Sequence, residues 1–188
     1  NYTALAVGAN NYTCAVTLGA PCNTTNTANL TITLNPLPNI TITNPPAVCF
    51  PNTVSLTGNA ITAGSDAGLT YSYFTDSAGT ITLSNAQAIS ISGTYYIKGT
   101  NANGCSFVSP VVVTINPLPL VLVVTPAAVC TPATVDITTP AITAGSTAGL
   151  TFTYYTDAAG TLPLGSPQAI AASGTYYIKG TNPVTGCS

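Results

Sequence analysis

The sequence repeats itself at a fixed interval of 81 residues. The tetrapeptide NPLP starts at Asn35 and again at Asn116, and 116 − 35 = 81. The stretch AITAGSDAGLTYSYFTDSAGT starts at Ala60 and returns as AITAGSTAGLTFTYYTDAAGT at Ala141, again 81 residues later. This period is too long for a solenoid unit that cannot fold alone, and it suits a small domain with its own core. The repeat therefore predicts tandem domains.

The repeat also sets the expected domain boundaries. Residues 35–115 form one complete repeat, 116–188 form a repeat that lacks its last strand, and 1–34 hold only the closing strands of a preceding repeat. Each NPLP segment is expected to be a stiff, extended joint, because proline fixes φ and biases the residue before it away from helix. We favour a window cut from one long chain. The alternative is separate subunits that exchange strands head to tail. Both predict an elongated, unbranched fibre.

Each repeat has the pattern of an all-β domain. Apolar residues alternate with polar ones, and turn residues interrupt them at short intervals, as in a β-sandwich. A turn is expected at Asp76–Gly79, and Pro110 indicates an edge strand or a bulge because proline cannot donate to a ladder. No segment predicts a helix. The expected strands are Ile40–Thr43, Thr53–Thr57, Leu69–Thr75, Thr80–Leu83, Ala88–Ile91, Gly93–Thr100 and Phe107–Ile115.

The phrase SGTYYIKGT, at Ser92 and again at Ser173, predicts a tyrosine corner. Tyr95 and Ile97 are expected to face the core, and the Tyr95 hydroxyl to return to the backbone, as in immunoglobulin-like sandwiches. The fragment 1–34 keeps the same distance from this tyrosine to the last cysteine, since 105 − 95 and 22 − 12 both equal 10. The predicted core tyrosines are Tyr12, Tyr95 and Tyr176.

The charge content excludes several classes of function. Only 3% of residues are charged, His is absent and the net charge is −2, so the basic surface that nucleic acid or an anionic membrane requires is missing. No apolar run is long enough for a membrane span. Asp76 and Asp157 repeat within turn sequences, whereas Asp66 becomes Thr147 in the next repeat. We therefore predict no catalytic constellation, no cofactor and no metal.

Lys98 and Lys179 recur at one repeat position. An isopeptide bond to either lysine would need a catalytic carboxylate beside it, but Glu is absent and Asp136 corresponds to Ser55. We interpret both lysines as exposed strand residues that oppose edge pairing.

Tyrosines on the strands suggest one further kind of site. They could stack on sugars, although alternating aromatic residues on a strand more often pack across strands. We favour packing. These residues are Tyr71, Tyr73, Tyr154 and Tyr155.

Six cysteines without histidine argue against zinc and for disulfides, and hence for an extracellular setting. Spacing leaves two pairing schemes open. The favoured scheme lies within repeats and joins Cys49 to Cys105 and Cys130 to Cys187, leaving Cys14 and Cys22 to close their own hairpin. The alternative joins Cys49 to Cys187 across the joint. In an immunoglobulin sandwich the turn that holds Cys49 and the last hairpin, which holds Cys105, lie at opposite ends of one domain, whereas the bottom of one domain abuts the top of the next.

The phrases GTYYIKGTNANGCS, NPLP and AVCFPNTVSLTG resemble the immunoglobulin-like repeats of large Bacteroidota surface proteins, including gliding adhesins and other type IX secretion cargo. The resemblance covers essentially the whole chain. It implies a secreted or surface-anchored stalk whose partners are neighbouring repeats or subunits of one fibre, and it brings no enzymatic residues. Asp76-Ser77-Ala78 also resembles the short O-glycosylation site of these bacteria, with Ser77 as the acceptor.

From these observations we predict tandem immunoglobulin-like β-sandwich repeats of about 81 residues that serve as a non-catalytic segment of an extracellular, cell-surface adhesin stalk or filament. The alternative is a carbohydrate- or ligand-binding module of a secreted protein, with surface glycans as partners. That alternative requires an exposed aromatic platform that one repeat has and another lacks.

Overall fold

The computed structural model describes residues 7–17, 20 and 25–188. The chain forms two compact units, which do not follow the sequence repeats. Among the described residues, no helix is long and apolar enough to cross a membrane. The first unit comprises Asn1–Pro45, Ser55–Ala88 and Gly93–Val113, and the second comprises Pro46–Val54, Ile89–Ser92 and Thr114–Ser188.

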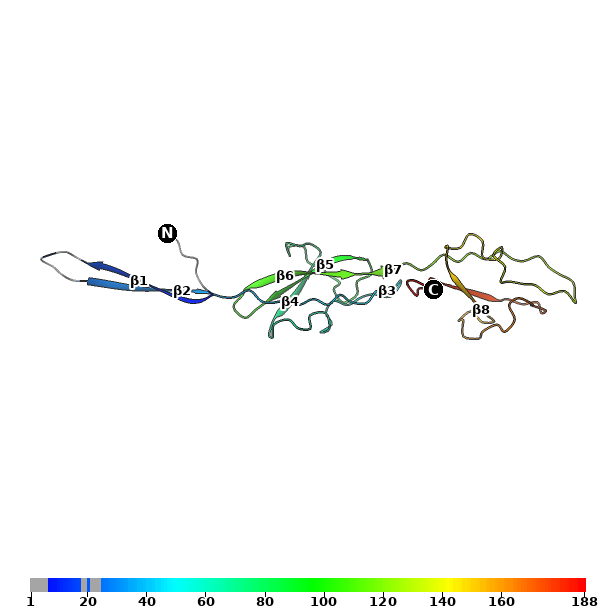
Figure 1. Ribbon diagram of the computed structural model, residues 1–188, viewed down its shortest axis with the longest axis horizontal. Helices are drawn as coiled ribbons and strands as arrows, with labels where there is room; N and C mark the ends of the chain where they lie inside the picture. The colour runs from blue at the N-terminus through cyan, green and yellow to red at the C-terminus, as the bar shows by residue number, and fades with distance from the viewer. Residues whose placement is uncertain (1–6, 18–19, 21–24) are drawn as a thin grey trace. The chain divides into compact units, whose positions relative to one another are not determined.

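The first unit contains two antiparallel sheets (Figure 1). Strands β1 (Gly8–Thr17) and β2 (Thr25–Leu34) form a two-stranded hairpin. Strands β4 (Thr70–Phe74), β5 (Gly93–Thr100) and β6 (Ser106–Val113) form a three-stranded sheet in the order β4-β5-β6. The central strand β5 therefore has a neighbour on each side.

The second unit contains two smaller sheets. Strands β3 (Val48–Cys49) and β7 (Ile115–Asn116) pair in parallel, and the C-terminus lies beside them (Figure 1). Strands β8 (Thr151–Tyr155) and β9 (Tyr177–Thr181) pair antiparallel in a two-stranded sheet. Strand β9 is the sequence equivalent of β5 but has a neighbour on one side only.

The absence of a helix from the described residues agrees with the all-β prediction. Strand β5 has the predicted bounds, and β6 lies at an edge of its sheet, as Pro110 indicated. The turn at Asp76–Gly79 is confirmed, because the Gly79 amide donates to the Asp76 carbonyl over 3.1 Å and Gly79 has a φ of +66°.

Several predicted strands are shorter than expected. Two of them, Thr53–Thr57 and Ala88–Ile91, meet only at the single bridge from Val54 to Ile89. The predicted strand Ile40–Thr43 forms no ladder, because the Ser65 hydroxyl takes the place of a strand partner. It accepts from the Thr41 amide at 3.0 Å and donates to the Thr41 carbonyl at 3.2 Å.

The core of the first unit lies on the inner face of β5 and β6. Ile97, Val111 and Val113 are at most 1% exposed, and they occupy alternate positions as a one-faced strand requires. Gly99 is also buried, and it has no room for a side chain: a Cβ there would lie 2.8 Å from Ile40 Cδ1. This contact recurs 81 residues later, where a Cβ at Gly180 would lie 2.7 Å from Val121 Cγ2. The two repeats thus share packing contacts as well as sequence.

Candidate functional site

A disulfide bond joins Cys49 to Cys187, whose Cα atoms lie 5.6 Å apart. Cys49 lies on β3 directly opposite Asn116, and the amide of Phe50 donates to the Asn116 carbonyl over 2.9 Å. Asn116 is the first residue of the NPLP joint. Cys49 belongs to the repeat 35–115 and faces the joint, and Cys187 belongs to the last hairpin of the following repeat. The bond therefore fastens the two repeats together at the joint.

The favoured pairing within each repeat is wrong, and the alternative across the joint is confirmed. The reason is topological: pairing with β7 holds Cys49 at the joint, which the Cys187 hairpin of the following repeat also reaches. Cys14, Cys105 and Cys130 are free thiols, so the prediction that all six cysteines are bonded is also wrong. The predicted bond from Cys14 to Cys22 involves a residue outside the described ones.

The tyrosines of the predicted corner differ among the three copies. The Tyr176 hydroxyl donates to the Ala172 carbonyl at 3.0 Å, which is the expected return to the backbone. The rings of Tyr95 and Tyr176 are half-buried. Tyr12 is 45% exposed, so its assignment to the core is wrong: β1 and β2 form only a two-stranded hairpin.

The two repeated lysines have different surroundings. Lys98 lies on the central strand β5 between Ser72 and Val108, and it is half-buried rather than exposed as predicted. It therefore cannot protect a sheet edge. Lys179 lies on β9, which lacks the second neighbour, and it is exposed.

The repeated aspartates organise turns. The Asp76 carboxylate accepts from the Ile81 amide at 2.7 Å and from the Thr80 hydroxyl at 2.8 Å. These hydrogen bonds favour the charged form and lower the pKa of Asp76, with the bond from Ile81 contributing most. Asp157 makes the same contacts in the next repeat, and its pKa is lowered for the same reason. Ser77 lies exposed within the first of these turns.

Asp66 also has a structural role, which explains why it is not repeated. Its carboxylate accepts from the Asn39 amide at 2.8 Å. In the next repeat the Thr147 hydroxyl accepts from the Leu120 amide at 2.9 Å. A carboxylate in one repeat and a hydroxyl in the next thus accept a hydrogen bond from equivalent backbone amides. No group of three potential metal ligands is present in the described part of the chain.

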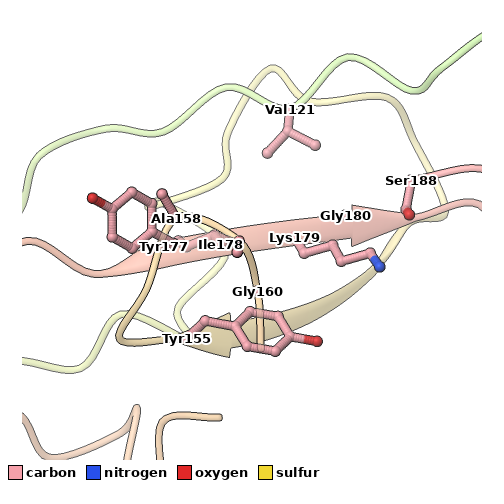
Figure 2. A pocket seen from close by; sticks show the side chains of 10 residues that line it. Val121, Tyr155, Ala158, Gly160, Tyr177, Ile178, Lys179, Gly180 and Ser188 are labelled. Carbon is pink, nitrogen blue, oxygen red and sulfur yellow. The ribbon is translucent and has the colours of Figure 1, made fainter. Parts of the chain in front are cut away.

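A hollow of about 380 Å³ lies beside strands β8 and β9 (Figure 2). Tyr155, Gly160 and Lys179 line it, and Figure 2 shows the ring of Tyr155 on β8 and the Lys179 side chain on β9. In the preceding repeat, Gly79 corresponds to Gly160, and a Cβ there would lie 3.3 Å from Val108 of β6. The strand that follows β5 thus occupies the place that stays hollow beside β9.

A second hollow of about 350 Å³ lies in the same unit. Polar and apolar atoms line it in similar measure, and the lining includes the segment that precedes Cys130. Among the lining residues are Val129, Val135, Ile137, Ile170, Ala172 and Tyr176.

Residues 37–117 match a domain family described as an Ig-like domain, CHU_C associated. This part of the chain is therefore similar to an immunoglobulin-like domain. Together with antiparallel sheets and no helix among the described residues, this match shows the all-β immunoglobulin-like fold that the sequence predicted, and it supports the resemblance to Ig-like domains of Bacteroidota type. No curated protein matches the chain.

Sequence reasoning did not identify either hollow. Each depends on which side chains the fold brings together, and the spacing of Tyr155, Gly160 and Lys179 along the sequence carries no signal for that.

Proposed function

We propose that this chain is a non-catalytic structural segment of a fibre on the outside of the cell, in which immunoglobulin-like repeats are joined end to end in an adhesin stalk or filament. The observation that supports the proposal best is the disulfide from Cys49 to Cys187, because it fastens one repeat to the next. A bond placed there strengthens a joint, which matters to a chain of domains and has no role in an isolated one.

The proposed location follows from the same bond. Disulfides form and persist in oxidising surroundings such as the cell surface and are rare in the cytosol. The proposed partners are neighbouring repeats or subunits of the same fibre. The repeated aspartates Asp76 and Asp157 accept hydrogen bonds from turn amides, which supports a structural role for them.

The ligand-binding alternative would use the hollow beside Tyr155 and Tyr177, with surface glycans as the ligands. Tyr177 is 38% exposed, so an aromatic surface is available there. We favour the structural role because Val108 fills the equivalent place in the preceding repeat. Glycan-array binding that is lost in Tyr177→Ala would reverse this preference. Ser77 is the proposed glycan acceptor, and peptide mass mapping of native material tests it.

Labelling of native cells tests the proposed location and form. An antibody raised against residues 37–117 should decorate filaments on intact, unpermeabilised cells in immunogold electron microscopy. The matched control is an antibody against a cytosolic protein of the same cells, which should label only after permeabilisation. If the first antibody also needs permeabilisation, the proposal fails.

A further inference from the structure

One row of exposed side chains changes from polar to apolar between the two repeats. It lies in the segment that follows each NPLP joint. In the repeat 35–115 the row is polar and consists of Asn39, Thr41 and Thr43, all exposed. The 81-residue shift places an apolar stripe at the same positions, namely Leu120, Leu122 and Val124. These side chains are 58%, 45% and 52% exposed. Exposure is therefore a property of these positions in both repeats, and only the chemistry of the side chains differs.

The segment beside this row changes in the same direction. The exposed Asp66 carboxylate accepts from the Asn39 amide, whereas the Thr147 hydroxyl accepts from the Leu120 amide in the next repeat. The surface thus loses a charge at the place where it gains apolar side chains. Single exposed apolar residues are ordinary, but a contiguous uncharged apolar patch marks a contact surface. We therefore interpret the apolar stripe as a binding surface that one repeat has and the other lacks.

The backbone of the stripe has one satisfied side and one open side. The amides of Leu120, Leu122 and Val124 all donate to the segment 142–147, over 2.7–2.9 Å. Alternation along an extended chain therefore directs the backbone groups of Val121 and Val123 to the opposite side. Within the described part of the chain these groups have no hydrogen-bond partner, and neither do those of the equivalent residues Ile40 and Ile42. The open edge is thus common to both repeats.

An open edge flanked by apolar side chains is a template for another extended strand. The segment is complementary to itself when two copies run antiparallel about a two-fold axis at Leu122. Val121 then lies opposite Val123 of the second copy, since 121 + 123 = 122 + 122, and such a pair can exchange both backbone hydrogen bonds. Leu122 lies opposite Leu122 of the second copy, and Leu120 lies opposite Val124. Residues that face each other in this way have Cβ atoms about 4.5–5.5 Å apart, so the two stripes would be in contact.

The sequence also limits the length of this pairing. Pro119 is the next residue whose backbone faces the open edge, and proline has no N–H to donate. The paired segment is therefore short, and one contact buries less surface than a standard protein interface. Contacts of this kind gain strength when several act together along two neighbouring fibres, because each one raises the effective concentration of the next.

We propose that the apolar stripe binds the same stripe of a second copy of this chain, side by side and antiparallel. A second copy fits because it brings no charge to the contact and because its Val121 and Val123 offer matching open backbone groups. The interface is the same patch on both partners, which is the arrangement of a two-fold dimer. The proposal adds a lateral contact to the proposed fibre, and the contact itself can form between single chains.

Sedimentation velocity of the purified chain at rising concentration tests the proposal. The mass should rise reversibly from 18.8 kDa towards twice that value. The triple variant Leu120→Asn/Leu122→Thr/Val124→Thr copies the polar row of the repeat 35–115, and it should weaken the dimer by about tenfold or more. Its circular dichroism should match the parent chain, because the same residues are compatible with the fold in that repeat. The control is Leu162→Asn, which removes an equally exposed leucine outside the stripe and should leave association unchanged.

Cysteine cross-linking tests the register. The background is Cys14→Ser/Cys105→Ser/Cys130→Ser, which removes the free thiols of the described residues. With oxidised glutathione, Leu122→Cys should give a covalent dimer linked through residue 122, because this position faces itself at a distance that a disulfide spans. Leu118→Cys replaces a leucine that is 46% exposed on the same segment. It lies opposite Pro126 in the proposed register, so it should give no such dimer.

Three results would overturn the proposal: a parent chain that stays monomeric at every concentration, association that is unchanged in the triple variant, or equal cross-linking through residues 118 and 122. A stripe that binds a different protein predicts the first of these. All three are measured on the purified chain, so they are independent of the labelling of native cells. Filaments on cells together with a monomeric purified chain would leave the proposed function standing and remove this contact.

Discussion

Removing the disulfide from Cys49 to Cys187 should destabilise mainly the repeat that follows the joint. The bond spans 138 residues along the chain. While the preceding repeat stays folded, pairing of Cys49 with Asn116 shortens the loop that matters to 71 residues, since 187 − 116 = 71. In the chain-entropy model a loop of this length contributes about 4 kcal/mol to the free energy of unfolding, and the full span contributes about 5 kcal/mol.

Thermal unfolding of Cys49→Ala/Cys187→Ala measures this effect. For a domain of this size, about 4 kcal/mol corresponds to a fall in Tm of roughly 15–30 °C. Two transitions are expected, one for each compact unit, and the transition of the unit that contains residues 116–188 should move most. Reduction of the parent chain by dithiothreitol breaks the bond but keeps both sulfur atoms, and it should lower the Tm by a similar amount. Comparing the two falls in Tm separates the loss of loop closure from the loss of packing at the buried Cys187.

The control is Cys130→Ser, which removes an exposed free thiol and should leave both transitions unchanged. A loss below about 1 kcal/mol in the double variant would contradict the loop argument, since the chain-entropy model gives several times more. An equal loss in Cys130→Ser would contradict the pairing itself.

Three further predictions concern single side chains. Gly99→Ala should lower the free energy of unfolding by about 1–3 kcal/mol through overpacking, whereas Gly58→Ala should have little effect because nothing lies within 4 Å of its added Cβ; urea unfolding compares them. The pKa of Asp76 is lowered in the fold from its ordinary value of 3.8, so its stabilising contribution is present above pH 3.8 and is lost as the pH falls through the lowered pKa. The stability advantage of the parent over Asp76→Asn should therefore shrink on acidification, and an unchanged difference would contradict this. Tyr176→Phe should lower the free energy of unfolding by about 0.5–1.5 kcal/mol, because one hydrogen bond is lost. An unchanged urea midpoint would show that the bond from Tyr176 to Ala172 does not stabilise the fold.

The alternation of apolar and polar residues within each repeat predicted the all-β fold. Alternation correctly assigned β5 and the inward direction of Ile97, because one face of that strand is buried and its period is fixed. Side-chain hydrogen bonds were harder to foresee. The Ser65 hydroxyl replaces a ladder partner for Thr41, so a segment with a strand-like pattern forms no strand.

The candidate site was only partly predictable, since cysteine pairing depends on which ends of two domains meet. The spacing left Cys49 with two partners, and only the β3–β7 pair decides between them. The same limit applies to Lys98. Its exposure depends on whether its strand has one neighbour or two, and a local pattern does not contain that information.

A disulfide across a joint has a mechanical consequence that a bond within a domain lacks. When the chain is pulled from its ends, covalent force passes from Cys49 directly to Cys187, so the 138-residue span between them carries no tension until the bond is reduced. At 3.3–3.6 Å per residue, reduction should release about 450–500 Å of additional length in single-molecule pulling. Pairing within repeats would instead shield two shorter loops from tension, and the segment between the two repeats would carry the pulling force. The measured length gain on reduction therefore separates a fibre whose joints are covalently bridged from one whose domains are individually locked.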